Sequence, residues 1–431
     1  MGGLEIAVLA VAFVVLLLWG VPISYAIALA TLATMLVSIP AMPALTTEVQ
    51  RIATGLDSFA LLAVPFFILA GHLMNHGGVA TRLIRLARAV LGGLPGGLAH
   101  VNILASMLFG AVSGSSVAAA SAVGSVMTPE MSKDGYDREF GAAVNVTAAT
   151  TGLLIPPSNV LIVYSLASGG VSIAALFMAG YLPGILVGLM LMGVAAYKAK
   201  KLGYGAAGTA HREPLGAALI DALPSLFMLF VVIGGIVAGI FTATEAAAIA
   251  VVYALVLALV YREVGWRDLP RIVLDASEMT AVVLLLVATS IGMSWIMAYV
   301  KLPAAVTGAL LAVGGNEIVV LLLINVVLLM VGTFMDITPA LLIFTPMFLP
   351  LAVEMGIDPV HFGIIMVLNL CIGICTPPVG SVLFVGVGVA GTTITRIVKP
   401  LLPFYAAMVI ALILVTYWPA LSMWLPGLLG L

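Results

Sequence analysis

Charged residues are scarce in this chain of 431 residues. Only 8% of them are Asp, Glu, Lys or Arg, whereas 63% are hydrophobic, and the mean hydropathy is +1.28. Soluble domains carry about 25% charged residues, so the composition excludes a soluble globular protein. The net charge of −2 argues against nucleic-acid binding, which needs a basic surface. We therefore predict an integral membrane protein.

Cysteine is nearly absent as well. Cys371 and Cys375 are the only two, four residues apart in an apolar segment. This setting favours packing within a helix over a disulfide or a metal site. The first apolar run lacks the basic start and the cleavage site of a signal peptide, so it is predicted to be a retained helix.

Apolar runs of spanning length recur along the chain, for example at 4–19, 223–240 and 403–417. A spanning helix needs roughly 20 mostly apolar residues, and lipid exposure permits only helices or closed barrels. Because the runs are continuous rather than alternating, we expect an all-α polytopic membrane protein.

The second half of the sequence repeats landmarks of the first half at an offset of about 221 residues. The stretch GLLIPPSN at 152–159 matches GICTPPVG at 373–380. Further matched pairs are Pro129 and Pro350, Gly135 and Gly356, and Gly71 and Gly292. We interpret this pattern as an internal duplication.

Each copy has the same predicted order: two unbroken spans, a third span, an amphipathic or weaker stretch, a hairpin, a broken segment and a last span. In the first copy these are 5–20, 22–38, 58–76, 78–92, 97–130, 138–166 and 172–194. In the second they are 222–241, 244–261, 277–298, 303–313, 318–352, 361–390 and 400–425. If the hairpins are re-entrant, each copy crosses the membrane an odd number of times, so the second copy is inverted.

The distribution of Lys and Arg supports this inverted topology. With the N-terminus outside, only Arg51 and Lys301 of the sixteen basic residues fall outside, and the others, Arg212 among them, fall on the cytoplasmic side. Loops rich in Lys and Arg stay cytoplasmic. Both termini are therefore predicted to lie outside. The basic stretch 78–92 is predicted to be a helix along the cytoplasmic surface, either a plain surface helix or an arm that links two moving parts.

The two Pro-Pro pairs are predicted to break helices at membrane depth, because proline removes a backbone donor and disfavours helix at the preceding residue. A break exposes carbonyl groups and two helix ends. The carbonyls and the helix C-terminus attract cations, and the helix N-terminus attracts anions. Inverted repeats with broken helices are typical of secondary transporters. The alternative is a simple kink between helices that pack through Gly and Ala.

The predicted hairpin tips carry oxygen-bearing side chains. SGSS at 113–116 places serines around Gly114, which permits a turn, and the serines either bind a hard cation or cap helices. GTFMDITP at 332–339 contains Asp336, the only acid between Glu317 and Glu354. An acid at this depth indicates a functional site, with a structural role as the alternative.

Several stretches together resemble the large membrane subunit of tripartite ATP-independent periplasmic (TRAP) transporters. They are PFFILAG (65–71), GAVSGSSVAAASAVGSVM (110–127), GLLIPPSN (152–159), MAGYLPGIL (178–186), GTFMDITPALLIFTPMFLP (332–350) and TPPVG (376–380). The resemblance implies an elevator-type transporter with inverted-topology repeats, re-entrant hairpins, and separate scaffold and transport parts.

The resemblance also implies two sodium sites with a substrate carboxylate between them, and no prosthetic group. Candidate sodium-site residues are Ser113, Ser115, Gly152, Ile155 and Pro157 in the first copy, and Gly332, Asp336, Gly373, Thr376 and Pro378 in the second. Candidate substrate residues are Ser116, Ser158, Asn159 and Thr333.

Further expectations follow from the resemblance. The expected partners are a small four-helix membrane subunit and a periplasmic substrate-binding protein. The expected substrate is a small organic acid such as a dicarboxylate, sialic acid or another sugar acid. The expected location is the bacterial inner membrane, in contact with lipid and with both termini periplasmic. The expected division is scaffold and arm spans at 1–76 and 222–298, interfacial arm, hairpin and broken helix at 77–194, a cytoplasmic linker at 195–221, and the second hairpin, broken helix and last span at 299–431.

Other functions fit the sequence less well. An intramembrane aspartyl protease needs two acids in its spans, and Asp336 has no evident deep partner; none of the five histidines has a persuasive serine partner for a serine protease. We therefore predict that the chain is not an enzyme. A channel does not need two matched broken helices. A sodium-coupled carboxylate carrier that works without a binding protein is the main alternative.

Overall fold

The computed structural model describes residues 2–204 and 214–431. These residues form α-helices and one short 3-10 helix, and no strand occurs among them. The all-α prediction is confirmed. The predicted cytoplasmic position of Arg212 lies outside the described residues.

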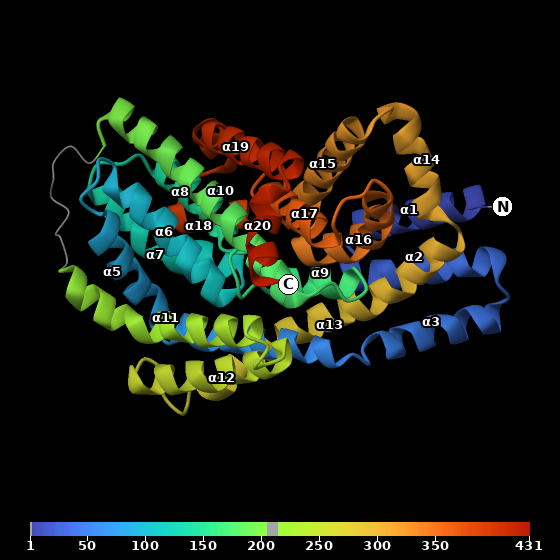
Figure 1. Cartoon of the computed structure of the whole chain (residues 1–431), viewed down its shortest axis with the longest axis horizontal. Coiled ribbons are helices and arrows are strands. Elements are labelled where there is room, and N and C mark those ends of the chain that lie inside the picture. The colour runs from blue at the N-terminus through green and yellow to red at the C-terminus, as the bar shows by residue number, and fades with distance from the viewer. Residues whose placement is uncertain (1, 205–213) are drawn as a thin grey trace.

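Helices of the first copy follow the predicted order (Figure 1). They are α1 (Gly2–Leu18), α2 (Ile23–Ser38), α3 (Ala41–Gly55), η1 (Phe59–Leu62), α4 (Ala63–His76), α5 (Val79–Leu91), α6 (Gly97–Ser113), α7 (Ser116–Lys133), α8 (Arg138–Thr151), α9 (Asn159–Ala167) and α10 (Ile173–Leu202). The α6–α7 pair is the first hairpin, and α8 and α9 flank the first Pro-Pro break.

The second copy repeats this order (Figure 1). Its helices are α11 (Leu215–Val237), α12 (Ala243–Val260), α13 (Leu269–Tyr299), α14 (Leu302–Gly314), α15 (Glu317–Phe334), α16 (Ile337–Glu354), α17 (Pro359–Gly373), α18 (Ser381–Ala390), α19 (Ile394–Tyr417) and α20 (Ala420–Leu429). The α15–α16 pair is the second hairpin, and α17 and α18 flank the second break.

Three segments differ from the sequence-based expectation. The predicted last span 400–425 is two helices, because the chain leaves the helical conformation at Trp418, and a residue before proline disfavours helix. Helix α3 was not predicted, because the helices were predicted from apolar runs and α3 contains several polar residues. The predicted linker 195–221 contains the end of α10 and the start of α11.

Eight of the described helical segments are long and apolar enough to span a membrane: Phe59–His76, α10, α11, α12, α13, α15, α16 and α19. Helices α1, α2, α6, α17, α18 and α20 are apolar but shorter. This inventory agrees with a polytopic membrane protein in which hairpins and broken helices contribute the short segments.

The two copies interlock through equivalent contacts. Helix α2 packs on α13, and its counterpart α12 packs on α4. Each hairpin contacts the first half of its own broken segment, α6 on α8 and α15 on α17, while α7 packs on α18 and α16 packs on α9 of the other copy. Each break is therefore held between both hairpins, which places the two breaks together in the centre of the molecule (Figure 1).

Helix α5, the basic stretch of the sequence, joins two parts of the fold. Its apolar face, which includes Leu83 and Ile84, is buried, and the helix packs on α6 and α11. Arg82 and Arg85 pair with Asp221 of α11 at 3.3 and 2.7 Å. Arg88 pairs with Glu130 of α7. Helix α5 therefore connects α11 to the first hairpin.

Helix α3 has an unusual distribution of side chains. Met42 and Val49 are exposed, whereas the carboxylate of Glu48 is buried, and its two oxygens accept no hydrogen bond from the described residues. These oxygens lie against Gly292 of α13, where a Cβ would come within 2.8 Å of Oε2. Burial raises the pKa of Glu48 to about 7.

We expect Glu48→Gln to change the pH dependence of stability. The pKa in the folded state lies above the ordinary value of 4.5, so the stability that Glu48 contributes by binding a proton is fully present below about pH 4.5 and is lost as the pH rises through about 7. Removing the charge should stabilise the protein at pH 8 by about 2–3 kcal/mol and flatten the profile between those values. Thermal unfolding in detergent as a function of pH measures this, with the exposed Glu317→Gln as the matched control; parallel profiles for the two variants would disprove the assignment.

Candidate functional site

The first hairpin turns at Gly114, which has a φ of +63°. Ser113 Oγ donates to the carbonyl of Ser115 at 3.4 Å, and Ser115 Oγ caps α7 by accepting from Ala118 N at 3.2 Å. The tip also presses against α4, since a Cβ at Gly71 would lie 2.6 Å from the Ser113 carbonyl oxygen. The hydroxyl groups of Ser113 and Ser115 therefore stabilise the turn and the start of α7.

The first break begins after Thr151, where α8 ends. Ser158 Oγ donates to the Leu153 carbonyl at 2.5 Å and caps α9 by accepting from Leu161 N. The carbonyls of Ile155, Pro156 and Pro157 accept no hydrogen bond from the described residues. Free carbonyls at membrane depth must face a cavity, a cation or water, because an unpaired polar group is costly in an apolar medium.

The second break repeats this arrangement. The carbonyls of Thr376, Pro377 and Pro378 likewise accept no hydrogen bond from the described residues, and both Pro-Pro bonds are cis. Gly380 N donates to the Thr333 carbonyl at 3.2 Å, which ties the break to the second hairpin. The Thr376 hydroxyl donates to the Ile372 carbonyl at 2.7 Å. Three free carbonyls at matched positions thus occur in each copy.

Each break touches its hairpin through a pair of glycines. A Cβ at Gly152 would lie 2.4 Å from the Cα of Gly110, and a Cβ at Gly373 would lie 2.5 Å from the Cα of Gly332. At such distances only the hydrogen atom of glycine fits, and any side chain would collide with the opposite backbone. Backbone therefore meets backbone directly in both copies, which positions the free carbonyls relative to the hairpin tips.

A second matched contact distinguishes the two copies. In the second, Ser381 Oγ donates to Asp336 Oδ1 at 3.4 Å. At the equivalent place in the first copy, 222 residues earlier in each case, Asn159 lies against Gly114, with its Nδ2 2.8 Å from the position of a Cβ. The duplication therefore keeps one carboxylate where the other copy has glycine. Among the described residues of the two hairpin tips, Asp336 is therefore the single acid.

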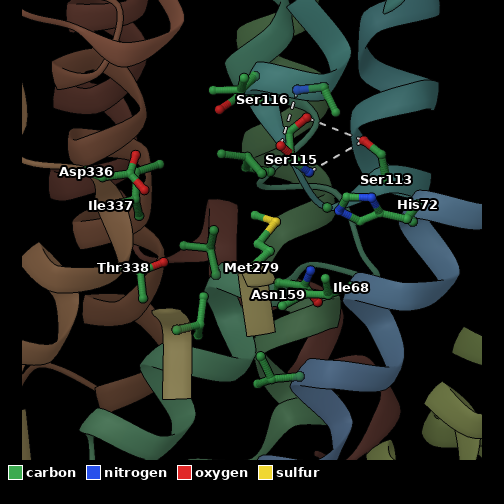
Figure 2. A pocket seen from close by; sticks show the side chains of 18 of the residues that line it. Ile68, His72, Ser113, Ser115, Ser116, Asn159, Met279, Asp336, Ile337 and Thr338 are labelled. Atoms are coloured by element: carbon green, nitrogen blue, oxygen red, sulfur yellow. Dashed lines mark hydrogen bonds between the residues drawn. The ribbon is translucent and has the colours of Figure 1, made fainter. Parts of the chain in front are cut away.

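A cavity of about 480 Å³ lies between the two hairpin tips. On one side it is lined by the first tip (Ser113–Ser116) and Asn159, and on the other by Asp336, Ile337 and Thr338 of the second hairpin. Figure 2 shows the two groups facing each other across the opening, with Met279 of α13 between them and His72 and Ile68 of α4 at its side.

Three helices begin at this cavity. Helix α7 starts at Ser116, α9 at Asn159 and α16 at Ile337, and all three residues line it. The first turn of a helix carries unpaired N–H groups and a partial positive charge. The cavity therefore combines an electropositive surface from both copies with the carboxylate of Asp336 and several hydroxyl groups.

The sequence-predicted residues fall into two groups. Ser113, Ser115, Ser116, Asn159 and Asp336 line the cavity. Gly152, Ile155, Pro157, Gly332, Gly373, Thr376, Pro378, Ser158 and Thr333 lie outside its lining, at the breaks and the hairpin contacts next to it. Within this second group the carbonyls of Ile155, Pro157, Thr376 and Pro378 accept no hydrogen bond from the described residues. The carbonyls of Gly152, Ser158, Thr333 and Gly373 do accept one.

Among the lining residues that were not predicted are the polar His72, Asn75 and Ser121 and the apolar Met279. His72 and Asn75 belong to α4 and follow Gly71, which the internal duplication pairs with Gly292. That pairing was the one sequence feature that pointed to this part of α4. Met279 could not be identified from sequence, because an apolar residue on a spanning helix looks the same whether it faces lipid or a cavity.

A family model described as the DctM component of tripartite ATP-independent periplasmic transporters matches residues 10–421. The chain belongs to this family. It is a TRAP transporter large permease subunit, and thus a multi-pass membrane transport protein rather than an enzyme.

Similar proteins agree with this assignment. The protein YgiK of Salmonella typhimurium is 53% identical over 423 residues, which cover 98% of this chain and 97% of YgiK. The C4-dicarboxylate TRAP transporter large permease protein DctM of Rhodobacter capsulatus is 39% identical over 97% of this chain and 98% of its own length. The YdaH transporter of Alcanivorax borkumensis, a solved structure described as having an unusual topology, shares the fold with a TM-score of 0.65 at 16% identity, over 89% of this chain and 90% of that chain.

Proposed function

We propose that this large permease subunit carries a small organic anion inward by sodium-coupled symport, together with a small membrane subunit and a periplasmic binding protein. The observation that supports this proposal most directly is the cavity between the hairpin tips, where three helix N-termini from both copies surround one carboxylate. A binding-protein-independent sodium/carboxylate symporter remains the second candidate, because the cavity itself would serve either delivery route.

The positive helix ends support an anionic substrate. The N-termini of α7 and α9 present N–H groups beside Ser116 and Asn159, and helix N-termini bind carboxylates readily. The Asn159 side chain makes no hydrogen bond with the described residues, so it is free to bind substrate. The DctM relative carries a name that specifies C4-dicarboxylates, and this class heads the substrates to be tested.

Asp336 supports coupling to a cation. A substrate carboxylate and Asp336 in one cavity repel each other unless a positive charge lies between them. Hydroxyl and carbonyl oxygens, which sodium prefers, are abundant here, and among the described residues no cluster of three or more His, Cys, Asp or Glu could hold a metal ion. Residues of the matched breaks and tips would hold the two sodium ions, mainly through backbone carbonyls.

Uptake measurements test the proposal. We expect the chain, reconstituted with its two partner proteins in vesicles, to accumulate a labelled C4-dicarboxylate or sugar acid when a sodium gradient is applied. A pH gradient without sodium should give less than about a tenth of that rate. Equal uptake under both conditions would refute sodium coupling, and full uptake without the binding protein would favour the second candidate.

We further propose an elevator movement, in which the hairpins and broken helices travel as one unit past α4 and the first spans. Cysteines at His72 and Ser113, in a background without Cys371 and Cys375, join α4 to the first tip, where the two face each other (Figure 2). The crosslink should abolish uptake, and reduction should restore it.

A matched pair of cysteines at Asp137 and Tyr204 serves as the control. These side chains are hydrogen bonded to each other and connect α8 to the end of α10. Because α10 packs on α6, α8 and α17 of the proposed moving unit, we expect it to travel with that unit. Crosslinking them should leave uptake intact. Full uptake with the His72–Ser113 crosslink in place would mean that the tip does not move relative to α4.

A further inference from the structure

Away from the central cavity, a groove of about 630 Å³ lies between α10 and α19, the last long spans of the two copies. The two helices pack side by side (Figure 1). The groove's walls are Met190, Gly193 and Tyr197 on α10, and Pro403, Ala407 and Ile410 on α19. This opening belongs to neither hairpin nor break, so transport chemistry does not account for it.

One end of the groove is cationic and the other is apolar. Lys198 and Lys201 line the end near the C-terminus of α10, beside Tyr197, whose side chain is 65% exposed. Met190 and Ile410 line the opposite, apolar end. A tyrosine next to lysines is typical of the membrane–water interface, where a spanning helix meets the lipid headgroups.

The basic charge extends onto α19 and is not neutralised locally. Arg396 and Lys399 precede Pro403 by seven and four residues, which places them on the same face of the helix. None of these four basic side chains forms an ion pair with a described acidic residue. The groove therefore offers unpaired positive charge above a hydrophobic channel.

We propose that this groove is a binding site for an anionic phospholipid of the phosphatidylglycerol type. The phosphate diester would lie against Lys198 and Lys201, and an acyl chain would run along Gly193 and Ala407 toward Ile410. Basic pockets between spanning helices recognise anionic headgroups in this way. A soluble polyanion would leave the apolar end uncovered, and a purely apolar helix would leave the lysines without a partner.

Native mass spectrometry of the purified chain, titrated with phosphatidylglycerol or phosphatidylethanolamine, tests this site without any transport measurement. The wild type should prefer phosphatidylglycerol. The double variant Lys198→Gln/Lys201→Gln should lose about 30-fold in apparent affinity, the effect of about 1 kcal/mol for each basic residue near an anionic surface. Lys200→Gln is the matched control, since Lys200 is an exposed neighbour outside the groove and should leave binding unchanged.

The channel for the acyl chain is tested separately by filling it. A Cβ at Gly193 meets no atom within 4 Å, so Gly193→Phe should fold normally and block lipid with either headgroup. Gly234→Phe on α11, where a Cβ also meets open space, is its control. Equal affinity for the two lipids, an unaltered lysine double variant, or unaltered binding in Gly193→Phe would each overturn the assignment.

Discussion

Asp336→Asn is expected to abolish sodium-driven uptake while leaving the protein folded. Asp336 occupies the N-cap position of α16 but its side chain makes no capping hydrogen bond, and asparagine is as favourable as aspartate at that position, so α16 should keep its N-terminus. The charge itself is lost, and two opposite charges about 4 Å apart near a protein surface attract by about 4 kcal/mol. Even half of that energy would weaken sodium binding about 30-fold. Uptake as a function of sodium concentration, with membrane insertion and the melting temperature measured in parallel, provides the test.

Asp358→Asn is the matched control for that experiment. Asp358 also occupies an N-cap position, at the start of α17, where its side chain accepts a hydrogen bond from Val360 N at 2.7 Å, but it does not line the cavity. The same chemical change at this position should leave uptake within about twofold of the wild type. Normal uptake by Asp336→Asn would assign the carboxylate a structural role, and equal losses in the two variants would mean that the cavity position of Asp336 is not what matters.

Much of the fold could be predicted from sequence, because membrane composition leaves few choices. Continuous apolar runs allow only helices, and proline pairs at a fixed offset marked the two breaks. Helix α3 was missed for a physical reason. It buries Glu48 and exposes Met42 and Val49, which reverses the usual pattern of burial, so neither hydropathy nor charge identified it.

The site was predicted less completely, because its central groups belong to the backbone. The sequence indicated both hairpin tips and both breaks. It could not show that the carbonyls of Ile155 and Pro377 are free, because every residue has a backbone carbonyl whatever its side chain. The convergence of three helix N-termini depends on how α16 packs on α9 of the other copy. Only the three-dimensional arrangement shows that Gly114 and Asp336 occupy equivalent positions beside Asn159 and Ser381.

The glycine contacts lead to the second large effect. Gly373→Ala is expected to separate the second break from its hairpin, because the new Cβ would lie 2.5 Å from the Cα of Gly332, closer than real Cβ contacts. Backbone atoms cannot rotate away as a flexible side chain can, so one helix must move by about 1 Å to reach ordinary van der Waals contact. Overpacking of this kind costs about 1–3 kcal/mol.

Because the same movement displaces the carbonyls of Thr376 and Pro378, we expect uptake to fall by more than the loss of stability explains. Sodium-driven uptake per folded protein should drop at least about tenfold, since ligands displaced by about 1 Å lose most of their contribution. Gly152→Ala should act in the same way through Gly110, and the double variant should reveal whether both breaks serve one cycle. Gly216→Ala is the control, because a Cβ there meets no atom within 4 Å. If Gly373→Ala transports like this control, the breaks are kinks between packed helices, and the ion-binding role assigned to their carbonyls is wrong.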